Sequence, residues 1–196
     1  MDGKKQALTL KQRVIGVLAL QGAVLPHKSH IEAAGGTFMP VKTVEDFARA
    51  DAFILPGGES TTMLKLIDTF GLEASLRRAF ADKPVWGICA GAILMAKKVS
   101  NPAQTSFALI DMDITRNAYG RQLASTVIAV DGYPVSYIRA PVIERTGPDV
   151  RVLAARDGKP IWVQQGQYIA TAFHPELTAD YPSPFHKTFV DGIRPR

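Results

Sequence analysis

The single cysteine of the chain lies in a pattern that favours nucleophilic chemistry. Residues 87–91 have the sequence Gly-Ile-Cys-Ala-Gly, with Cys89 at the centre, between an apolar run and a helical pattern. This G-x-C-x-G segment is the cysteine counterpart of the G-x-S-x-G nucleophile elbow, in which flanking glycines permit a sharp turn. A thiol at a helix N-terminus is also favoured as thiolate by the helix dipole. The alternative is structural, because a lone cysteine is commonly a small buried apolar side chain.

A nucleophilic thiol needs a general base that later protonates the leaving group, and histidine is the usual choice. The chain contains four histidines, His27, His30, His174 and His186. His174 follows a strand-like run and precedes Pro175 and Glu176, so that a carboxylate is available to orient its ring. We therefore predict a Cys89, His174, Glu176 triad. The other three histidines are expected on helix faces without a catalytic role, and Glu176 taken alone could equally cap a turn.

A further candidate segment follows another strand-like run. Residues 55–60 have the sequence Leu-Pro-Gly-Gly-Glu-Ser. Gly57 and Gly58 allow backbone N–H groups to approach a ligand, and with the N–H of Ala90 they could form an oxyanion hole. The alternative is an ordinary strand-to-helix turn in which Ser60 caps the next helix.

The elements that must position these groups alternate along the first half of the chain. Apolar runs of strand length occupy residues 14–20, 37–41, 51–55 and 84–88, and helical patterns occupy residues 26–34, 43–50, 60–70 and 90–98. This alternation predicts an open, mostly parallel sheet with helices on both faces. Ligands bind such sheets at the carboxyl ends of the strands. Both Cys89 and the Gly57-Gly58 pair come directly after a predicted strand.

The second half of the chain has a different pattern of elements from the first half. Short strand-like runs separated by turn signals occupy residues 122–130, 134–139, 150–155, 160–164 and 167–173. We expect them to form hairpins added to the same sheet, followed by a closing helix over residues 182–190. Without an internal repeat or a low-complexity linker, residues 14–196 are predicted to form one domain. Residues 1–13 are predicted to be a basic, frayed tail.

Composition excludes several classes of function. The 196 residues are 46% hydrophobic and 21% charged, which is typical of a globular protein, and no apolar run approaches the length of a membrane span. A single cysteine rules out intramolecular disulfides and paired-cysteine metal sites, and it favours a cytoplasmic location. Most of the formal charge of +5 falls on the two ends of the chain. A nucleic-acid partner is therefore not expected.

The combined motifs resemble the class I, triad-type glutamine amidotransferases, and among them the glutaminase subunits of pyridoxal 5′-phosphate synthase. The G-x-C-x-G segment and the His174-Pro175-Glu176 run carry the resemblance to the class. The narrower resemblance is carried by blocks at residues 16–23, 55–63, 116–122, 138–141 and 173–178, which occur in the expected order.

This resemblance implies a flavodoxin-like α/β fold with an antiparallel hairpin extension. It implies hydrolysis of L-glutamine to L-glutamate and ammonia through a glutamyl thioester on Cys89, with no cofactor and no metal. It also implies delivery of the ammonia to a separate synthase subunit. His174 would protonate the ammonia and activate the water, with Glu176 orienting its ring.

The resemblance also assigns binding roles. The oxyanion donors would be the N–H groups of Gly58 and Ala90. The glutamine pocket would be lined by Gly57, Gly58, Glu59, Arg116, Ile138 and Arg139. Arginine suits the substrate α-carboxylate, although each arginine could instead form a surface ion pair. Gln21 would lie near the oxyanion hole and the partner surface.

The sequence departs from the family at three places. Leu25-Pro26 stands where arginine and glutamate are usual, which affects the expected contact with the synthase subunit. Thr115 stands where glutamate is common, and residues 1–13 have no counterpart. Two alternatives stay open, a glutaminase of another pathway such as imidazole glycerol phosphate synthesis, and a partner-binding subunit without catalysis. We expect low activity without the synthase, because ammonia made without an acceptor wastes glutamine.

Overall fold

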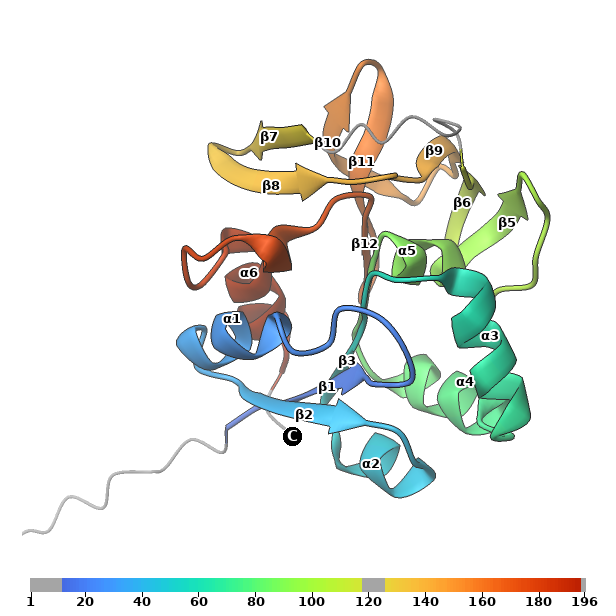
Figure 1. The fold of residues 1–196 in the computed structure, drawn as a ribbon, viewed down its shortest axis with the longest axis vertical. Coiled ribbons are helices and arrows are strands. Elements are labelled where there is room, and N and C mark those ends of the chain that lie inside the picture. The colour runs from blue at the N-terminus through green and yellow to red at the C-terminus, as the bar shows by residue number, and fades with distance from the viewer. Residues whose placement is uncertain (1–11, 118–125, 195–196) are drawn as a thin grey trace, which may run out of the picture.

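The central sheet of the protein is mixed and has seven strands (Figure 1). The computed structural model describes residues 12–117 and 126–194. The strand order is β10-β11-β12-β4-β3-β1-β2. The parallel part contains β1 (Val14–Leu18), β2 (Thr37–Val41), β3 (Ala52–Leu55), β4 (Val85–Ile88) and β12 (Tyr168–Thr171). β10 (Arg151–Arg156) and β11 (Lys159–Gln165) extend it with antiparallel pairing.

The order of the parallel strands creates a binding crevice. β1 pairs with β2 on one side and with β3 on the other. The chain therefore places β2 at one edge of β1 and then returns to place β3 and β4 on its opposite edge. At such a switch point the loops after the two neighbouring strands diverge and leave a crevice at the carboxyl ends. The α/β fold predicted from the sequence is confirmed.

Two groups of helices cover the two faces of the sheet (Figure 1). One face packs against α1 (His27–Ala33) and α6 (Pro184–Gly192), and the other against α2 (Val44–Arg49), α3 (Ser60–Thr69), α4 (Glu73–Asp82) and α5 (Ala90–Met95). Strand side chains alternate between the faces. Phe53 and Leu55 pack towards α2–α5, whereas Ala52 and Ile54 pack towards α1 and α6.

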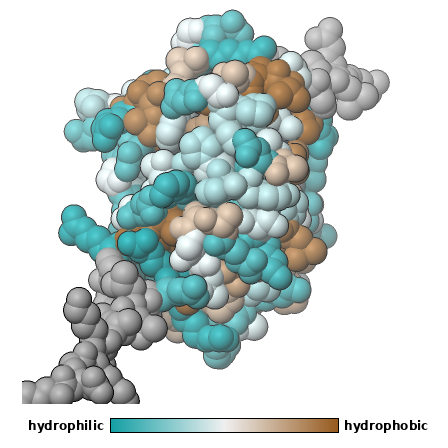
Figure 2. All heavy atoms as spheres, turned by 90° about the vertical axis from the view of Figure 1, so that its left-hand side faces the viewer, coloured by the Kyte–Doolittle hydropathy of each residue, from teal (hydrophilic) through white to brown (hydrophobic). Residues whose placement is uncertain are grey.

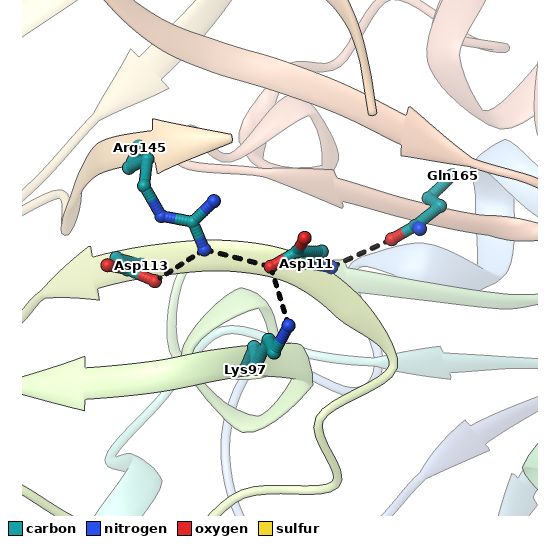
Figure 3. Close-up of polar contacts among 5 residues, drawn as sticks. All are labelled: Lys97, Asp111, Asp113, Arg145 and Gln165. Atoms are coloured by element: carbon teal, nitrogen blue, oxygen red, sulfur yellow. Dashed lines mark hydrogen bonds and ion pairs between the residues drawn. The ribbon is translucent and has the colours of Figure 1, made fainter. Parts of the chain in front are cut away.

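Two smaller sheets complete the described part of the chain. One has three strands, β5 (Ala96–Ser100), β6 (Ile110–Thr115) and β9 (Val142–Thr146), and the other is the hairpin of β7 (Thr126–Val130) and β8 (Tyr133–Tyr137). An exposed cluster of charged side chains, called here the Asp111 cluster, connects the three strands of the first of these sheets (Figure 3). In it, Arg145 contacts Asp111 at 2.8 Å and Asp113 at 3.0 Å, and Lys97 contacts Asp111 at 3.2 Å. The Asp111 N–H donates to Gln165 of β11 at 2.7 Å, which joins this sheet to the central one.

Several sequence-based expectations about the elements are wrong. The helix expected over residues 90–98 ends at Met95, because the chain continues as β5 and pairs with β6, a strand that was not predicted. α4 and β9 were not predicted either. Only β10, β11 and β12 join the central sheet as hairpin strands, whereas β7 and β8 form a sheet of their own. Ser60 does not cap α3: Glu59 occupies the cap position, and the Ser60 hydroxyl donates to Gln104 at 3.1 Å.

Some expectations fall outside the described residues. These include the predicted tail up to residue 11 and residues 122–125 of one predicted strand. Among the described residues, no helix is long and apolar enough to cross a membrane.

Candidate active site

The predicted site residues converge on one pocket. The loops after β1, β3, β4 and β12 carry Gln21, Gly57, Cys89 and His174 respectively, and these strands are neighbours in the sheet. The pocket has a volume of about 340 Å³. Its lining includes Gln21, Gly57, Gly58, Glu59, Cys89, Ala90, Arg116, Ile138, Arg139 and His174. Glu176 is not in the lining, because it lies buried behind His174.

The turn at Cys89 has the strained backbone expected of a nucleophile elbow. Cys89 has φ 49° and ψ −101° and directly precedes α5. Its N–H donates to the Thr171 carbonyl at 2.8 Å, which anchors the turn to the end of β12. A side chain at Gly91 would run into the Leu55 carbonyl, so this glycine lets α5 approach β3. The strained conformation of Cys89 is thus held by the surrounding elements.

His174 is fixed through both its backbone and its ring. Its N–H donates to the Ser136 carbonyl at 2.8 Å and its carbonyl accepts from the Ser136 N–H at 3.2 Å. Its Nδ1 lies 2.7 Å from Oε1 of Glu176, a residue of the short 3₁₀ helix η1 (Pro175–Leu177). Because an ionised carboxylate only accepts hydrogen bonds, Nδ1 is the protonated donor in this pair. The other ring nitrogen is thereby left for the thiol.

The electrostatics favour a charged pair of His174 and Glu176. Burial alone would lower the pKa of His174, but hydrogen bonds to the Cys89 thiol and the Glu176 carboxylate outweigh it and raise the pKa to about 10. Burial would raise the pKa of Glu176, but the His174 hydrogen bond and the nearby His27 and His174 keep that pKa below its usual value. At neutral pH the ring is therefore protonated beside an ionised carboxylate.

The loop after β3 is fitted closely around its neighbours. A side chain at Gly57 would place its Cβ 2.9 Å from Nδ1 of His174, so only glycine allows the ring to pack there. The Gly57 carbonyl accepts from the Ala23 N–H at 2.9 Å, which fixes the orientation of the Gly57-Gly58 peptide. Oε1 of Gln21 accepts from the Glu59 N–H at 2.9 Å. The loops after β1 and β3 are thus joined at two points.

Charged side chains form the rim of the pocket. Arg139 contacts Glu59 at 3.1 Å, with both side chains more than half exposed. Arg116 donates to the Thr61 hydroxyl at 2.8 Å. The surface ion pair considered as an alternative for the arginines is therefore present at Arg139. Such an exposed pair contributes little to stability, so it does not explain why two arginines and a carboxylate line one pocket.

The sequence-based prediction missed a group of buried histidines next to the triad. His27 and His30 lie on α1 and His186 on α6, as expected, but all three side chains are fully buried. The signal for two of them was available, because residues three apart share one helix face and the neighbouring Ile31 is a core residue.

Comparisons with known proteins agree with this geometry. Residues 17–194 match the SNO glutamine amidotransferase family. The protein called pyridoxal 5′-phosphate synthase subunit PdxT in Koribacter versatilis is 44% identical over 186 residues, covering 92% of this chain and 95% of the relative. The protein of the same name in Solibacter usitatus is 45% identical over 191 residues, covering 91% and 98%. A crystal structure of a glutamine amidotransferase matches with a TM-score of 0.82 and 38% identity, covering 90% of this chain and 97% of the other.

The arrangement suits covalent catalysis by a thiol. The Cys89 thiol and the His174 ring, which is oriented by Glu176, line one pocket together with two arginines and a glutamate. Among residues 12–117 and 126–194, no group of three or more histidine, cysteine or acidic side chains could hold a metal ion.

Proposed function

Because the chain belongs to the SNO glutamine amidotransferase family, we propose that it is the glutaminase subunit of a pyridoxal 5′-phosphate synthase and supplies ammonia for vitamin B6 synthesis. The observation that carries the mechanism is that Cys89 and His174 line the same pocket while Nδ1 of His174 lies 2.7 Å from Oε1 of Glu176. The partner is a separate synthase subunit, as the names of the relatives imply for those proteins.

In the first half of the reaction, the Cys89 sulfur attacks the side-chain amide carbon of L-glutamine. We take the thiolate as the attacking form, and the raised pKa of His174 supports a protonated ring beside it. The negative charge that develops on the amide oxygen would be bound by the N–H groups of Gly58 and Ala90. When the tetrahedral intermediate collapses, the C–N bond breaks, His174 gives its proton to the nitrogen, and ammonia leaves behind a glutamyl thioester.

In the second half, water takes the place of ammonia. The now neutral His174 removes a proton from the water, which attacks the thioester carbon. The C–S bond then breaks and L-glutamate leaves. His174 keeps the proton that it took from the water, so the imidazolium and the thiolate are both restored. Glu176 keeps the ring in one orientation through both halves and balances its positive charge. The sum is one glutamine and one water converted into one glutamate and one ammonia.

Charge complementarity supports an α-amino acid as substrate. Arg116 and Arg139 are available for the α-carboxylate, and Glu59 is available for the α-ammonium group. Ile138 provides an apolar wall for the methylene groups. Binding of glutamine would exchange the exposed Arg139–Glu59 contact for contacts with the substrate.

The proposal is tested by measuring glutamate release from glutamine, with and without the synthase subunit. We expect strong activation by the synthase and loss of activity by about 10⁴-fold or more in Cys89→Ala. An electrophilic glutamine analogue should label Cys89 in the complex, as detected by mass spectrometry. Undiminished turnover in Cys89→Ala would overturn the mechanism.

The same experiment separates the two alternatives. A partner-binding subunit without catalysis would bind the synthase but would neither release glutamate nor take up the label. A glutaminase of another pathway would be activated by a different synthase. The similarity to the two PdxT proteins along nearly their whole length argues against that second alternative.

A further inference from the structure

A line of buried polar side chains runs from α6 towards the back of the triad. Nδ1 of His186 lies 2.6 Å from the Ser183 hydroxyl, and Nε2 of His186 lies 2.9 Å from Nδ1 of His27. All three side chains are fully buried. We call Ser183, His186 and His27 the buried histidine chain. It joins α1 to α6, and the face of the molecule on this side carries hydrophilic and hydrophobic residues side by side (Figure 2).

Two atoms at the end of this chain lack hydrogen-bond partners among residues 12–117 and 126–194. They are Nε2 of His27 and Oε2 of Glu176, and both are buried. The two residues are electrostatically coupled, since Glu176 raises the pKa of His27 and His27 lowers that of Glu176. An unsatisfied buried polar atom is costly, and most costly on a charged group. A donor on one residue and an acceptor on the other would satisfy both.

The direction of the hydrogen bonds in the buried histidine chain decides whether His27 can be that donor. If Nδ1 of His27 carried the proton, Nε2 would have only a lone pair and could not donate to a carboxylate, which only accepts. With the proton on Nε2, Nδ1 of His27 accepts from Nε2–H of His186. Nδ1 of His186 then accepts from the Ser183 hydroxyl, whose oxygen in turn accepts from the His186 backbone N–H at 3.2 Å. This assignment gives each bond within the buried histidine chain one donor and one acceptor, and it leaves the Nε2–H of His27 as the donor still to be paired.

His30 holds the chain in place and obeys the same pattern. Its Nδ1 accepts from the Ser183 N–H at 3.0 Å, so its Nε2 carries the proton and donates to the Thr178 carbonyl at 3.1 Å. Its ring stacks on that of His186, with centroids 4.4 Å apart and planes within 10°. Since His30 bonds to Thr178, just beyond η1, the same packing fixes the segment that carries Glu176.

We propose, on the basis of the function proposed above, that His27 is a positioning residue for glutamine hydrolysis and donates its Nε2–H to the free oxygen of Glu176. Donors would then hold both carboxylate oxygens, His174 on one side and His27 on the other. The carboxylate could neither rotate nor take up a proton easily, so it would keep His174 aimed at Cys89. The donors run in one direction from Ser183 through His186 and His27 to Glu176.

His27 acts in this arrangement as a neutral dipole. Burial lowers its pKa to about 4, against the opposing effect of Glu176 and with small contributions from His30 and His174. Burial also holds the pKa of His186 well below its usual value. Glu176 therefore forms its ion pair with His174 alone. A charged His27 would compete for the same carboxylate and weaken that ion pair.

The test compares two replacements of His27 in the complex with the synthase subunit. His27→Gln places an amide nitrogen near the Nε2 position and keeps the donor to Glu176. His27→Asn places its amide near Nδ1 and removes that donor. We expect His27→Asn to lower kcat by about tenfold with little change in KM, and to move the acid limb of the kcat/KM profile to higher pH, because Glu176 is then protonated more easily. His27→Gln should restore kcat to within about threefold of the wild type.

Two results would overturn the proposal. One is a folded His27→Asn variant with the kcat and acid limb of the wild type, and the other is an equal loss in both variants, which would point to simple packing. Cys89-dependent activity of the wild-type complex is the control, because its absence would instead refute the proposed function.

A second measurement is independent of activity and of any variant. ¹⁵N chemical shifts of the histidine side chains in the wild-type protein distinguish the two neutral tautomers. We expect His27, His30 and His186 all to be protonated on Nε2 at neutral pH. A proton on Nδ1 of His27 would reverse the chain and exclude donation to Glu176.

Discussion

The buried histidine chain and the Asp111 cluster are both networks of polar side chains, but they are built on opposite principles. The Asp111 cluster holds four formal charges and lies at the surface, where the Arg145 side chain is 47% exposed and that of Asp111 is 27% exposed. Arg145 and Lys97 lower the pKa of Asp111 below its usual value. The histidine chain is fully buried, and its members are neutral.

The difference shows that the positions of hydrogen-bonded atoms must be defined closely in the buried chain but not in the exposed cluster. Water solvates and screens the charges of the Asp111 cluster, so each contact there is replaceable. In the buried chain each bonded ring nitrogen has a single partner, and a bond made in the wrong direction leaves two lone pairs or two protons facing each other. The charged Glu176 and His174 lie close enough to influence the pKa of His27.

Among the changes that test this comparison, Glu176→Gln should have the largest effect, because it breaks the buried network at its charged end. A glutamine side chain offers one acceptor oxygen, so one of the two donors, His174 or His27, would face an NH₂ group. The neutral amide also cannot balance an imidazolium. We expect kcat for glutamine hydrolysis to fall by about 100-fold or more in the complex. A loss below tenfold in a folded variant would mean that the carboxylate is dispensable.

A smaller effect is expected on acid stability. In the unfolded chain His27 takes up a proton near pH 6.5, whereas in the folded chain its pKa is lowered to about 4 and it stays neutral above that pH. Stability is therefore lost as the pH falls between these values, by about 3 kcal/mol for His27. His30 and His186, whose pKa values are also lowered by burial, act in the same direction. His174 acts in the opposite direction near the upper end of this range, because it stays protonated in the folded chain, where its pKa is raised to about 10, whereas in the unfolded chain it takes up its proton near pH 6.5.

Urea unfolding of the wild type and His27→Gln between pH 7 and pH 4.5 would measure this effect. The free energy of unfolding of the wild type should decrease as the pH falls. That of the variant should decrease less, because about one proton fewer is taken up on unfolding. Parallel curves would show that His27 is already protonated in the folded protein, which would contradict its role as a neutral donor.

The smallest effect is expected from Arg145→Ala, which removes the centre of the Asp111 cluster. Because its contacts are exposed, Tm should fall by at most about 3 °C, and less at high salt. Glutaminase activity in the complex should not change, because Arg145 does not line the pocket. A large, salt-independent drop in Tm would contradict this comparison, because it would mean that the contacts of the Asp111 cluster are no more replaceable than those of the buried histidine chain.

The predictable part of the site came from residues that follow strands. The elbow around Cys89, the glycines after β3 and the run beginning at His174 all occur where a strand pattern ends, so their convergence follows from a parallel sheet. The separation of Cys89 and His174 along the chain did not matter, because β4 and β12 are neighbours.

Other parts of the fold were missed for identifiable reasons. β6 alternates buried and half-buried residues, with Ile110, Met112 and Ile114 inward, but it has no turn signal that marks it as a strand. The end of α5 at Met95 depends on pairing of β5 with β6, which is decided by contacts distant in sequence rather than by helix propensity.

The chemistry itself was determined by the sequence, because the identity of a nucleophile, a base and a carboxylate does not depend on packing. Which of four histidines meet was decided only by the tertiary structure. His27 and His186 are 159 residues apart and touch because α1 and α6 cover the same face of the sheet. Hydrogen bonds act over about 3 Å, so the direction of a buried chain is fixed only when the helices that carry it are packed together.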